Sequence, residues 1–346
     1  MNPNQILKAS LISNSKSYLR NRIFLENENQ IFFALLKNKL KKINIDLSTE
    51  DINNPNNSEI NFYFDVPYVK YKNDSFKIFY AIESPAVLPK NYEYENYSKF
   101  DIVFTWNEKI IDNKKVFKIN YSSDLSYRIN GKVFEERALI CNISSNKFSI
   151  NKKELYTKRS ILIKDLNNHE NDFHLYGNGW DMIPKNKRLF EASLVFMKNK
   201  YLNKFYRLIS KFLPKSFFLN FNNYKGLTHQ KIKTSSNYKF ALCFENIINK
   251  NGYISEKITD CFLSYTIPIY LGYNNVSELI PKQLYIDFRS FSSSNELIEF
   301  INQFSKKEYL EFKKNVDKFL KSSESNIFDV NYNVNKLIEI FQHQYK

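Results

Sequence analysis

The stretch YKFALCFENIINKNGYISEKITDCFLSYTIPIYLG (Tyr238–Gly272) contains two apolar runs on either side of a segment with helical character. YKFALCFEN and TIPIYLG have the length and the aromatic or β-branched content of buried strands. A helix is expected between them, from Glu256 to about Ser264, because Ser255 is a good N-cap residue and apolar side chains follow it. This order of strand, helix and strand predicts a parallel sheet covered by helices.

The expected helix begins with two adjacent opposite charges, Glu256 and Lys257. The first turn of a helix presents unpaired N–H groups and partial positive charge, which suit a phosphate group. Lys257 would add a full positive charge, Glu256 would accept hydrogen bonds from sugar hydroxyls, and Tyr253 would stack on a ligand or close over it. The other interpretation is a solvated first turn in which Glu256 favours the helix dipole, and local chemistry alone leaves both open.

Strands and helices alternate through the rest of the chain. In the first half a helix is expected at Glu28–Ile43, followed by strands in EINFYFDVP, FKIFYAIESP, FDIVFTWN and KVFKINYS. A second unit is expected from Ala138, with a strand in RALICNISSN, a helix at Asn151–Leu166 and a strand in FHLYGNGWD. Two amphipathic helices, Lys306–Lys321 and Asn331–His343, close the chain.

This alternation predicts an α/β protein with two units of similar size and a cleft between them. The expected segments are an N-terminal unit at 1–137, a second unit at 138–325, and a C-terminal helix at 326–346 that packs back across the junction. Ligands of open α/β sheets bind at the carboxyl ends of the strands, and both CFEN and IESP lie at such ends.

Composition and missing motifs exclude several classes of protein. With 346 residues and 43% hydrophobic content, the chain can form one large or two ordinary domains. The cysteines Cys141, Cys243 and Cys261 are far apart with apolar neighbours, which predicts buried thiols and no disulfide framework or zinc site. Residues Met1–Arg20 lack the continuous apolar region of a signal peptide and no apolar run is long enough for a membrane span, so neither is expected and a cytoplasmic location is predicted. GxGxxG, P-loop, HExxH, GxSxG and compact DxD motifs are all absent, and no metal site is expected.

The net charge of +15 points to an anionic partner or to a generally basic, soluble surface. Residues 192–244 contain no Asp or Glu but carry 10 Lys and Arg residues, interleaved with aromatic and leucine side chains. One interpretation is a peripheral contact with the inner membrane surface, and the other is a core-facing helix with a lysine face. A nucleic-acid-binding protein is an alternative of another class, although no RNP, KH or helix-turn-helix pattern is present.

The 44 residues Tyr238–Pro281 resemble the signature of the family 10 glycosyltransferases, the α-1,3/4-fucosyltransferases. The core of that family reads roughly F-x-L-x-F-E-N, G-Y-x-T-E-K, a helix, T-I-P-[IV]-Y-x-G and N-V-x-x-[FL]-I-P. Ser255 replaces the usual threonine and keeps the hydroxyl group, and Leu271 stands where an aromatic residue is common. The resemblance extends less strongly to FYAIESP, SSN, LYTKRSILIKDL and LYGNGW, the last typical of bacterial members, and it spans roughly Phe79–Pro281.

This resemblance implies the GT-B fold, in which two Rossmann-like domains face a cleft. It also implies GDP-β-L-fucose as the donor, a glycan hydroxyl as the acceptor, and inversion of configuration. By resemblance, Glu83 is the general base and Arg159 reaches the pyrophosphate. Such a reaction needs a carboxylate that takes the acceptor proton, and cations that stabilise the GDP leaving group. The expected donor-binding residues are Arg159, Glu245, Asn246, Tyr253, Ser255, Glu256 and Lys257.

Several alternatives stay open within this family. No metal or cofactor is expected to be required, and stimulation by a divalent cation is left open. The donor sugar could be another GDP-linked 6-deoxy sugar, because the shape of the sugar pocket decides between such donors. The acceptor also stays open among N-acetyllactosamine, a lacto-type chain, chitin-like oligomers, and a lipopolysaccharide O-antigen unit or similar surface or protein-linked glycan. Neither the linkage nor the oligomeric state follows from the sequence.

Overall fold

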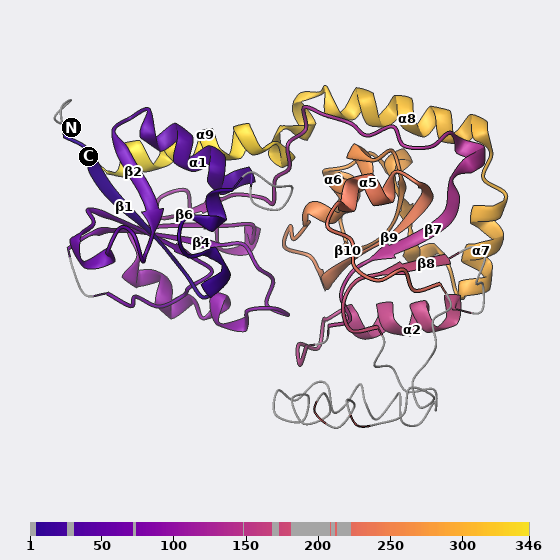
Figure 1. Cartoon of the computed structure of the whole chain (residues 1–346), viewed down its shortest axis with the longest axis horizontal. Coiled ribbons are helices and arrows are strands. Elements are labelled where there is room, and N and C mark those ends of the chain that lie inside the picture. Colours follow the sequence, from indigo (N-terminus) through magenta and orange to yellow (C-terminus); the bar gives the residue numbers. More distant parts are fainter. Residues whose placement is uncertain are drawn as a thin grey trace. The chain divides into compact units, whose positions relative to one another are not determined.

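The computed structural model describes residues 5–25, 31–71, 74–147, 149–167, 173–180, 208, 212 and 223–345 (Figure 1). The chain forms two compact units. Unit 1 contains Met1–Ser126, Asn251–Glu256 and Leu320–Lys346, and unit 2 contains Tyr127–Lys250 and Lys257–Phe319.

Unit 1 is built on a parallel six-stranded sheet with the order β2-β1-β3-β4-β5-β6. Its strands are β1 (Leu7–Ser13), β2 (Ile45–Thr49), β3 (Ile60–Phe64), β4 (Phe76–Ala81), β5 (Ile102–Thr105) and β6 (Val116–Lys118). The four strands expected in the first half of the chain are therefore present, and β1 and β2 extend the sheet beyond them. From β1 the chain turns to β2 on one side, and from β3 it proceeds to β6 on the other. The carboxyl ends of the strands near this switch in direction are the usual ligand-binding edge.

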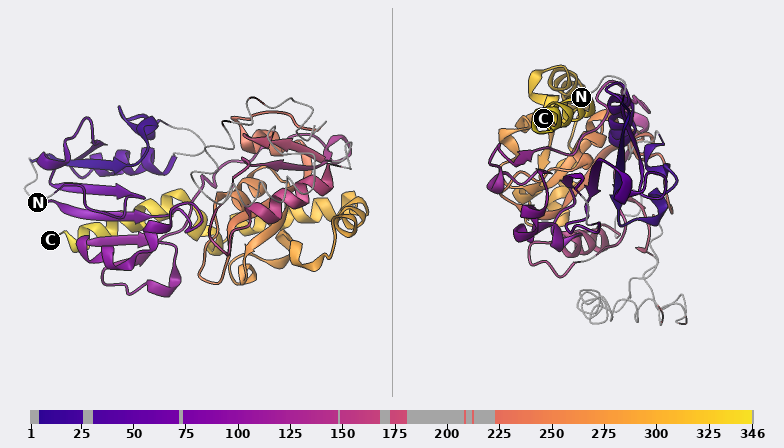
Figure 2. Two further views of the ribbon diagram at one scale, coloured as in Figure 1. Left: turned by 90° about the horizontal axis from the view of Figure 1, so that it is seen from below. Right: turned by 90° about the vertical axis from the view of Figure 1, so that its left-hand side faces the viewer.

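The two faces of this sheet are covered in different ways. The helices α1 (Ile31–Lys41) and α9 (Val330–Gln344) pack against each other and against the sheet, as two further views also show (Figure 2). Tyr80 of β4 points to this side, where its ring stacks on Phe32 of α1 at 5.0 Å between centroids. Side chains alternate along a strand, so Phe79 points to the opposite face.

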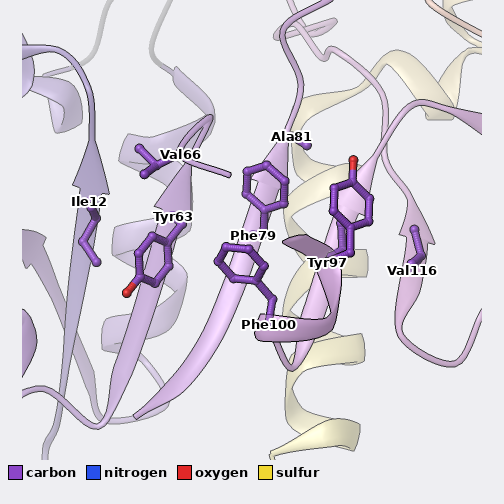
Figure 3. Packing of buried hydrophobic residues seen from close by; sticks show 9 residues of the cluster. Ile12, Tyr63, Val66, Phe79, Ala81, Tyr97, Phe100 and Val116 are labelled. Carbon is purple, nitrogen blue, oxygen red and sulfur yellow. The ribbon is translucent and has the colours of Figure 1, made fainter. Parts of the chain in front are cut away.

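An aromatic cluster covers that opposite face in place of an α-helix. Phe79 stacks on Phe100 at 4.9 Å between centroids, and Tyr97 meets Phe79 edge-on at 5.6 Å (Figure 3). Tyr97 comes from a 3₁₀-helix, Tyr94–Lys99, in the connection between β4 and β5. The strict alternation of strands and α-helices expected in this half therefore does not hold. The connection contains two prolines, Pro85 and Pro89, and proline lacks the N–H group that an α-helix needs.

Unit 2 is built on a parallel five-stranded sheet with the order β11-β10-β9-β7-β8. Its strands are β7 (Ala138–Ile143), β8 (Phe173–Tyr176), β9 (Tyr238–Asn249), β10 (Ile267–Tyr273) and β11 (Ile286–Asp287). The described helices are α2 (Tyr156–Leu166), α5 (Lys231–Ser235), α6 (Glu256–Leu263), α7 (Ser294–Asn302) and α8 (Lys306–Leu320). The strand, helix and strand expected in Tyr238–Gly272 are β9, α6 and β10.

The division into units does not follow the three segments expected at 1–137, 138–325 and 326–346. Residues 127–137 belong to unit 2, where the buried Arg137 donates hydrogen bonds to the carbonyls of Tyr238 and Tyr265, both at 3.0 Å. The C-terminal segment belongs to unit 1, where Val330 N–H donates to the Ser123 carbonyl at 3.0 Å. Contacts between an isolated arginine and backbone carbonyls leave no periodic pattern in the sequence. This explains why the second unit was expected to begin at 138, although it begins at Tyr127.

The thiols of Cys141, Cys243 and Cys261 are buried and free, as the sequence predicted. Within the part of the chain that the structure describes, no helix is long and apolar enough to cross a membrane. The basic segment 192–244 underlies the membrane interpretation. Its residues 192–222 lie outside the described residues except for Leu208 and Phe212.

Candidate functional site

The switch point of the unit 2 sheet lies between its neighbouring strands β7 and β9. From β7 the chain continues to β8 at one edge, and from β9 it continues to β10 and β11 toward the other. Ligands of open α/β sheets bind at the carboxyl ends of the strands at such a point. The loop after β7 leads to α2, which carries Arg159, and the carboxyl half of β9 carries Glu245 and Asn246.

Arg159 is a buried cation, with a relative exposure of only 3%. Its Nη2 donates to the Ser145 carbonyl at 3.1 Å, its guanidinium lies 5.3 Å from the centre of the Tyr156 ring, and its Nε has no hydrogen-bond partner. Among the described residues, Arg159 forms no salt bridge. Burial lowers the pKa of Arg159 to about 10, so the side chain still carries its charge at neutral pH. A buried cation with an unused donor is a site for an anion.

Strand β9 is irregular where it carries Glu245. The register between β9 and β10 shifts between Leu271 and Tyr273, so that Glu245–Ile248 stand opposite the single residue Gly272. Irregularities of this kind redirect side chains and are common next to binding sites. The redirected segment includes two expected site residues, Glu245 and Asn246.

The irregular segment of β9 is held by the loop before α2. The Asn246 carbonyl accepts from Leu155 N–H at 3.0 Å, and Ile248 N–H donates to the Lys153 carbonyl at 2.8 Å. Helix α2 begins at Tyr156, directly after this loop. The backbone of β9 therefore anchors the helix that carries Arg159.

Glu245 is completely buried and lies beside Lys257 of α6. The distance from Lys257 Nζ to Glu245 Oε2 is 3.5 Å, and the lysine side chain retains 25% exposure. Gly272 makes room for the carboxylate, because a Cβ atom at this position would lie 2.4 Å from Glu245 Cγ. Lys257 is thus a partly exposed cation with a buried carboxylate behind it.

In unit 1, Glu83 lies two residues beyond β4 and is half-buried. Its N–H donates to Asp65 Oδ1 at 3.1 Å, and its carbonyl accepts from the Tyr92 hydroxyl at 2.6 Å. Asp65 directly follows β3, and both burial and the negative charge of Glu83 raise the pKa of Asp65 to about 7. Two carboxylates from neighbouring strands therefore lie at the same edge of the sheet.

The segment Asn251–Glu256 belongs to unit 1, although α6 continues from it into unit 2. Glu108 N–H donates to the Asn251 carbonyl at 3.0 Å. Gly252 has a φ of +90°, a conformation that favours glycine, and a Cβ atom there would lie 2.9 Å from Glu108 Cδ. These contacts hold Tyr253, Ser255 and Glu256 on unit 1.

The ring of Tyr253 is fully enclosed within unit 1. It meets Trp106 edge-on at 4.9 Å between centroids and Tyr121 at 5.9 Å, and its relative exposure is 0%. In this structure the ring therefore serves as packing and is not open to stack on a ligand. The pKa of Tyr121 is raised well above its ordinary value, first by burial and then by the charges around it, which include Glu83 and Glu256.

The expected site residues thus form one group in each unit. Unit 2 brings together Arg159, Glu245, Asn246 and Lys257, and unit 1 holds Glu83, Tyr253, Ser255 and Glu256. Sequence reasoning missed Asp65 and Tyr121, which follow strands β3 and β6. The one available signal for Asp65 was its place after the apolar run FYF, at the carboxyl end of a strand.

Among the described residues there is no group of three or more His, Cys, Asp or Glu side chains that could hold a metal ion. His174 contacts the Tyr238 hydroxyl through Nδ1 at 2.8 Å.

Two open parallel sheets in one chain form the GT-B fold, which this chain shares with solved glycosyltransferase structures. The chain belongs to glycosyltransferase family 10 (fucosyltransferase), because the model of the C-terminal region of that family matches residues 135–331, more than half of the 346 residues.

Individual relatives agree with this family. The α-(1,3)-fucosyltransferase FucT of Helicobacter pylori is 41% identical over 66 residues, which are 19% of this chain and 14% of that protein. The 4-galactosyl-N-acetylglucosaminide 3-α-L-fucosyltransferase 9 of Mus musculus is 34% identical over 109 residues, or 31% of this chain and 29% of that protein. The matched part thus spans less than a third of either relative. A crystal structure of an α1,3-fucosyltransferase with GDP-fucose superposes with a TM-score of 0.55 at 18% identity, over 98% of this chain and 90% of that one.

Proposed function

We propose that this protein transfers L-fucose from GDP-β-L-fucose to a hydroxyl group of a glycan acceptor, with inversion at the anomeric carbon. The observation that carries the proposal is Arg159, a buried guanidinium with an unused Nε at the switch point of unit 2. A guanidinium binds phosphate oxygens with two parallel hydrogen bonds, and an anion there would offset the cost of burying the cation. The relatives are named as α-1,3-fucosyltransferases, and the superposed α1,3-fucosyltransferase was crystallised with GDP-fucose, which supports this donor.

The reaction is a single displacement in this scheme. The acceptor oxygen attacks the anomeric carbon while its proton passes to the Glu83 carboxylate. The bond between the anomeric carbon and the β-phosphate oxygen breaks, and GDP leaves with the electron pair. Arg159 and Lys257 stabilise the growing negative charge on GDP. The acceptor bond forms opposite the leaving group, which inverts the configuration.

The remaining expected residues bind the donor in this proposal. Glu256 accepts hydrogen bonds from ribose or fucose hydroxyls, and Ser255 precedes the first turn of α6, where the helix dipole is positive and favours a phosphate. Asn246 contributes from the irregular part of β9, and Glu245 acts through Lys257. Tyr253 contributes by packing under this segment.

Two finer choices belong to the same proposal. The donor sugar is fucose in preference to another GDP-linked 6-deoxy sugar, on the strength of the names of the relatives. The acceptor is a surface glycan such as an O-antigen unit, in an α-1,3 or α-1,4 linkage, and the basic segment 192–244 brings the enzyme to the membrane surface. Membership of a glycosyltransferase family replaces the nucleic-acid-binding alternative.

A donor panel tests the proposal. Slow hydrolysis without acceptor is measured for GDP-fucose, GDP-mannose and UDP-sugars, and glycan acceptors are then screened with the active donor. We expect turnover of GDP-fucose alone. A protein that hydrolyses only UDP-sugars, or none of the panel, would contradict it.

The role of Glu83 has its own test. Glu83→Gln replaces the base by an amide of the same size. It should lower kcat at least about 100-fold, because no carboxylate is left to take the proton from the acceptor hydroxyl. The affinity for GDP-fucose, measured by calorimetry, should stay within about twofold, since Arg159 and Lys257 make the phosphate contacts of the proposal. Full turnover by this variant would remove Glu83 as the base.

A further inference from the structure

Asp65 holds the backbone of the proposed base. Its Oδ1 accepts hydrogen bonds from Ile82 N–H at 3.0 Å, from Glu83 N–H at 3.1 Å and from Asn91 Nδ2 at 2.6 Å. The side chain is only 6% exposed, so these contacts are shielded from water. One carboxylate oxygen thus fixes two consecutive N–H groups beyond β4 and a side chain of the following loop.

The other parts of this arrangement are equally fixed. The Tyr92 hydroxyl donates to the Glu83 carbonyl at 2.6 Å, so the peptide groups on both sides of the Glu83 Cα are held. The Tyr97 hydroxyl donates to the Asn91 carbonyl at 2.6 Å, which secures the third donor to Asp65. Asp65 itself has a φ of 52°, and its carbonyl accepts from Asn14 Nδ2 at 3.2 Å.

We propose that Asp65 is the positioning residue of the base, acting through Glu83 without touching the substrate. It fixes the main chain from which the Glu83 carboxylate reaches the acceptor, and its negative charge makes that carboxylate a stronger base. The proposal rests on the function proposed above, in which Glu83 accepts the acceptor proton. Asp65 neither gains nor loses a proton in the transfer step.

The groups around Asp65 determine how strongly its charge acts on the Glu83 carboxylate. Burial, followed by the negative charge of Glu83, raises the pKa of Asp65 to about 7, and no cation is among the causes of the shift. The other titratable groups that sense Asp65 are tyrosines whose pKa lies above the ordinary value: Tyr18, Tyr80, Tyr92, Tyr97 and Tyr121. These hydroxyls stay neutral near pH 7, whereas Asp65 gains its negative charge as the pH rises through about 7.

Two variants of Asp65 separate its hydrogen bonds from its charge. In Asp65→Asn, the amide oxygen still accepts the three hydrogen bonds, so kcat should stay within about tenfold of wild type. The lost charge should instead remove from the kcat/KM profile a rise near pH 7, because ionisation of Asp65, whose pKa is about 7, is what makes the Glu83 carboxylate a stronger base. In Asp65→Ala the three hydrogen bonds to Asp65 Oδ1 are lost, so the Glu83 main chain is no longer fixed. We then expect kcat to fall about 100-fold while the affinity for GDP-fucose, measured by calorimetry, is unchanged.

Asp112 provides a matched control. Its Oδ1 also accepts from three main-chain N–H groups, those of Lys114, Lys115 and Val116, each at 2.8 Å, on the loop that enters β6. Asp112→Ala removes the same kind of hydrogen bonds and Asp112→Asn removes only the charge, in both cases without involving Glu83, so both variants should keep the wild-type kcat and pH profile.

Stability provides a readout that does not depend on turnover. A carboxyl group with a folded pKa near 7 and an ordinary value of 3.8 favours the folded state below about pH 4, and this contribution is lost as the pH rises to about 7. Asp65→Asn should remove that decline in the melting temperature, and Asp112→Asn should not.

The outcomes distinguish the two proposals. Wild-type kcat and pH profiles in both Asp65 variants, with Glu83→Gln inactive, would overturn the role of Asp65 and leave the base in place. A fully active Glu83→Gln would overturn the base and the positioning role together. If Asp65→Ala does not fold, a rise near pH 7 that persists in Asp65→Asn overturns the proposal, and its loss supports it.

Discussion

Arg159 acquires its proposed role from burial. On a helix surface an arginine is normally solvated, but here the guanidinium is 3% exposed and its Nε has no partner. Burial without a salt bridge destabilises the free protein, and in the proposed complex a bound pyrophosphate would relieve this cost. Arg159 should therefore lower the stability of the ligand-free protein and raise the stability of its complex with GDP.

We predict that Arg159→Met weakens GDP binding at least about tenfold without lowering the melting temperature of the ligand-free protein, since a flexible apolar side chain replaces a buried charge. Calorimetry with GDP and thermal unfolding with and without GDP measure both quantities. A lower melting temperature together with unchanged GDP affinity would instead make Arg159 a structural residue.

Lys257 combines a proposed contact with phosphate and a contact with a buried carboxylate, Glu245 Oε2, at 3.5 Å. We predict that Lys257→Ala both weakens GDP binding and destabilises the protein by about 1–3 kcal/mol, because the Glu245 carboxylate loses a charged partner. The double variant Lys257→Ala/Glu245→Gln should recover stability and not GDP affinity. Recovery of GDP affinity in the double variant would show that Lys257 serves only as the counter-ion of Glu245.

At the scale of elements, the irregular pairing of β9 and β10 builds the donor side of the proposed site. Four residues of β9, Glu245–Ile248, stand opposite Gly272, and two of them, Asn246 and Ile248, form backbone hydrogen bonds with the loop that precedes α2. The carboxylate of Glu245 occupies the space that a side chain at position 272 would take. The absence of a side chain at Gly272 thus leaves room for the Glu245 carboxylate, which contacts Lys257.

We predict that Gly272→Ala destabilises the protein by about 1–3 kcal/mol and weakens GDP binding, because the added Cβ would lie 2.4 Å from Glu245 Cγ and 2.7 Å from the Tyr270 hydroxyl. Chemical denaturation and calorimetry with GDP provide the two measurements. Loss of stability with unchanged GDP affinity would show that Glu245 does not contribute to donor binding.

At the scale of the whole molecule, the two units are not continuous segments of the chain. The last part of the chain, Leu320–Lys346, returns to unit 1, where Phe341 of α9 meets Phe76 of β4 edge-on at 5.9 Å between ring centroids. The C-terminal helix is therefore part of the core of the unit that carries Glu83 and Asp65.

We predict that Phe341→Ala, which empties a fully buried position, destabilises unit 1 by about 3–5 kcal/mol. Hydrogen exchange should show lost protection in β3 and β4 and little change in β7 and β9, because stability is distributed locally within a structure. Equal loss of protection in both sheets would mean that the two units unfold as one.

The sequence by itself determined the α/β class, most strands and long helices, and the family to which the chain belongs. These properties depend on local patterns: apolar runs in strands, helical spacing, and the contiguous signature of Tyr238–Pro281. The same signature predicts Lys257 and Glu256 as donor-binding residues, because the chemistry of a helix start is visible along the chain. Resemblance added Arg159 and Glu83, whose surroundings no local pattern describes.

Only the tertiary structure decided the burial of Arg159, the carboxylate behind Lys257, the enclosure of Tyr253, and the contact between Asp65 and Glu83. Asp65 and Glu83 are 18 residues apart in the sequence and meet because β3 and β4 are parallel neighbours whose carboxyl ends share one edge. Strand order and burial result from packing of the whole chain, and neither leaves a periodic signal at the residues concerned.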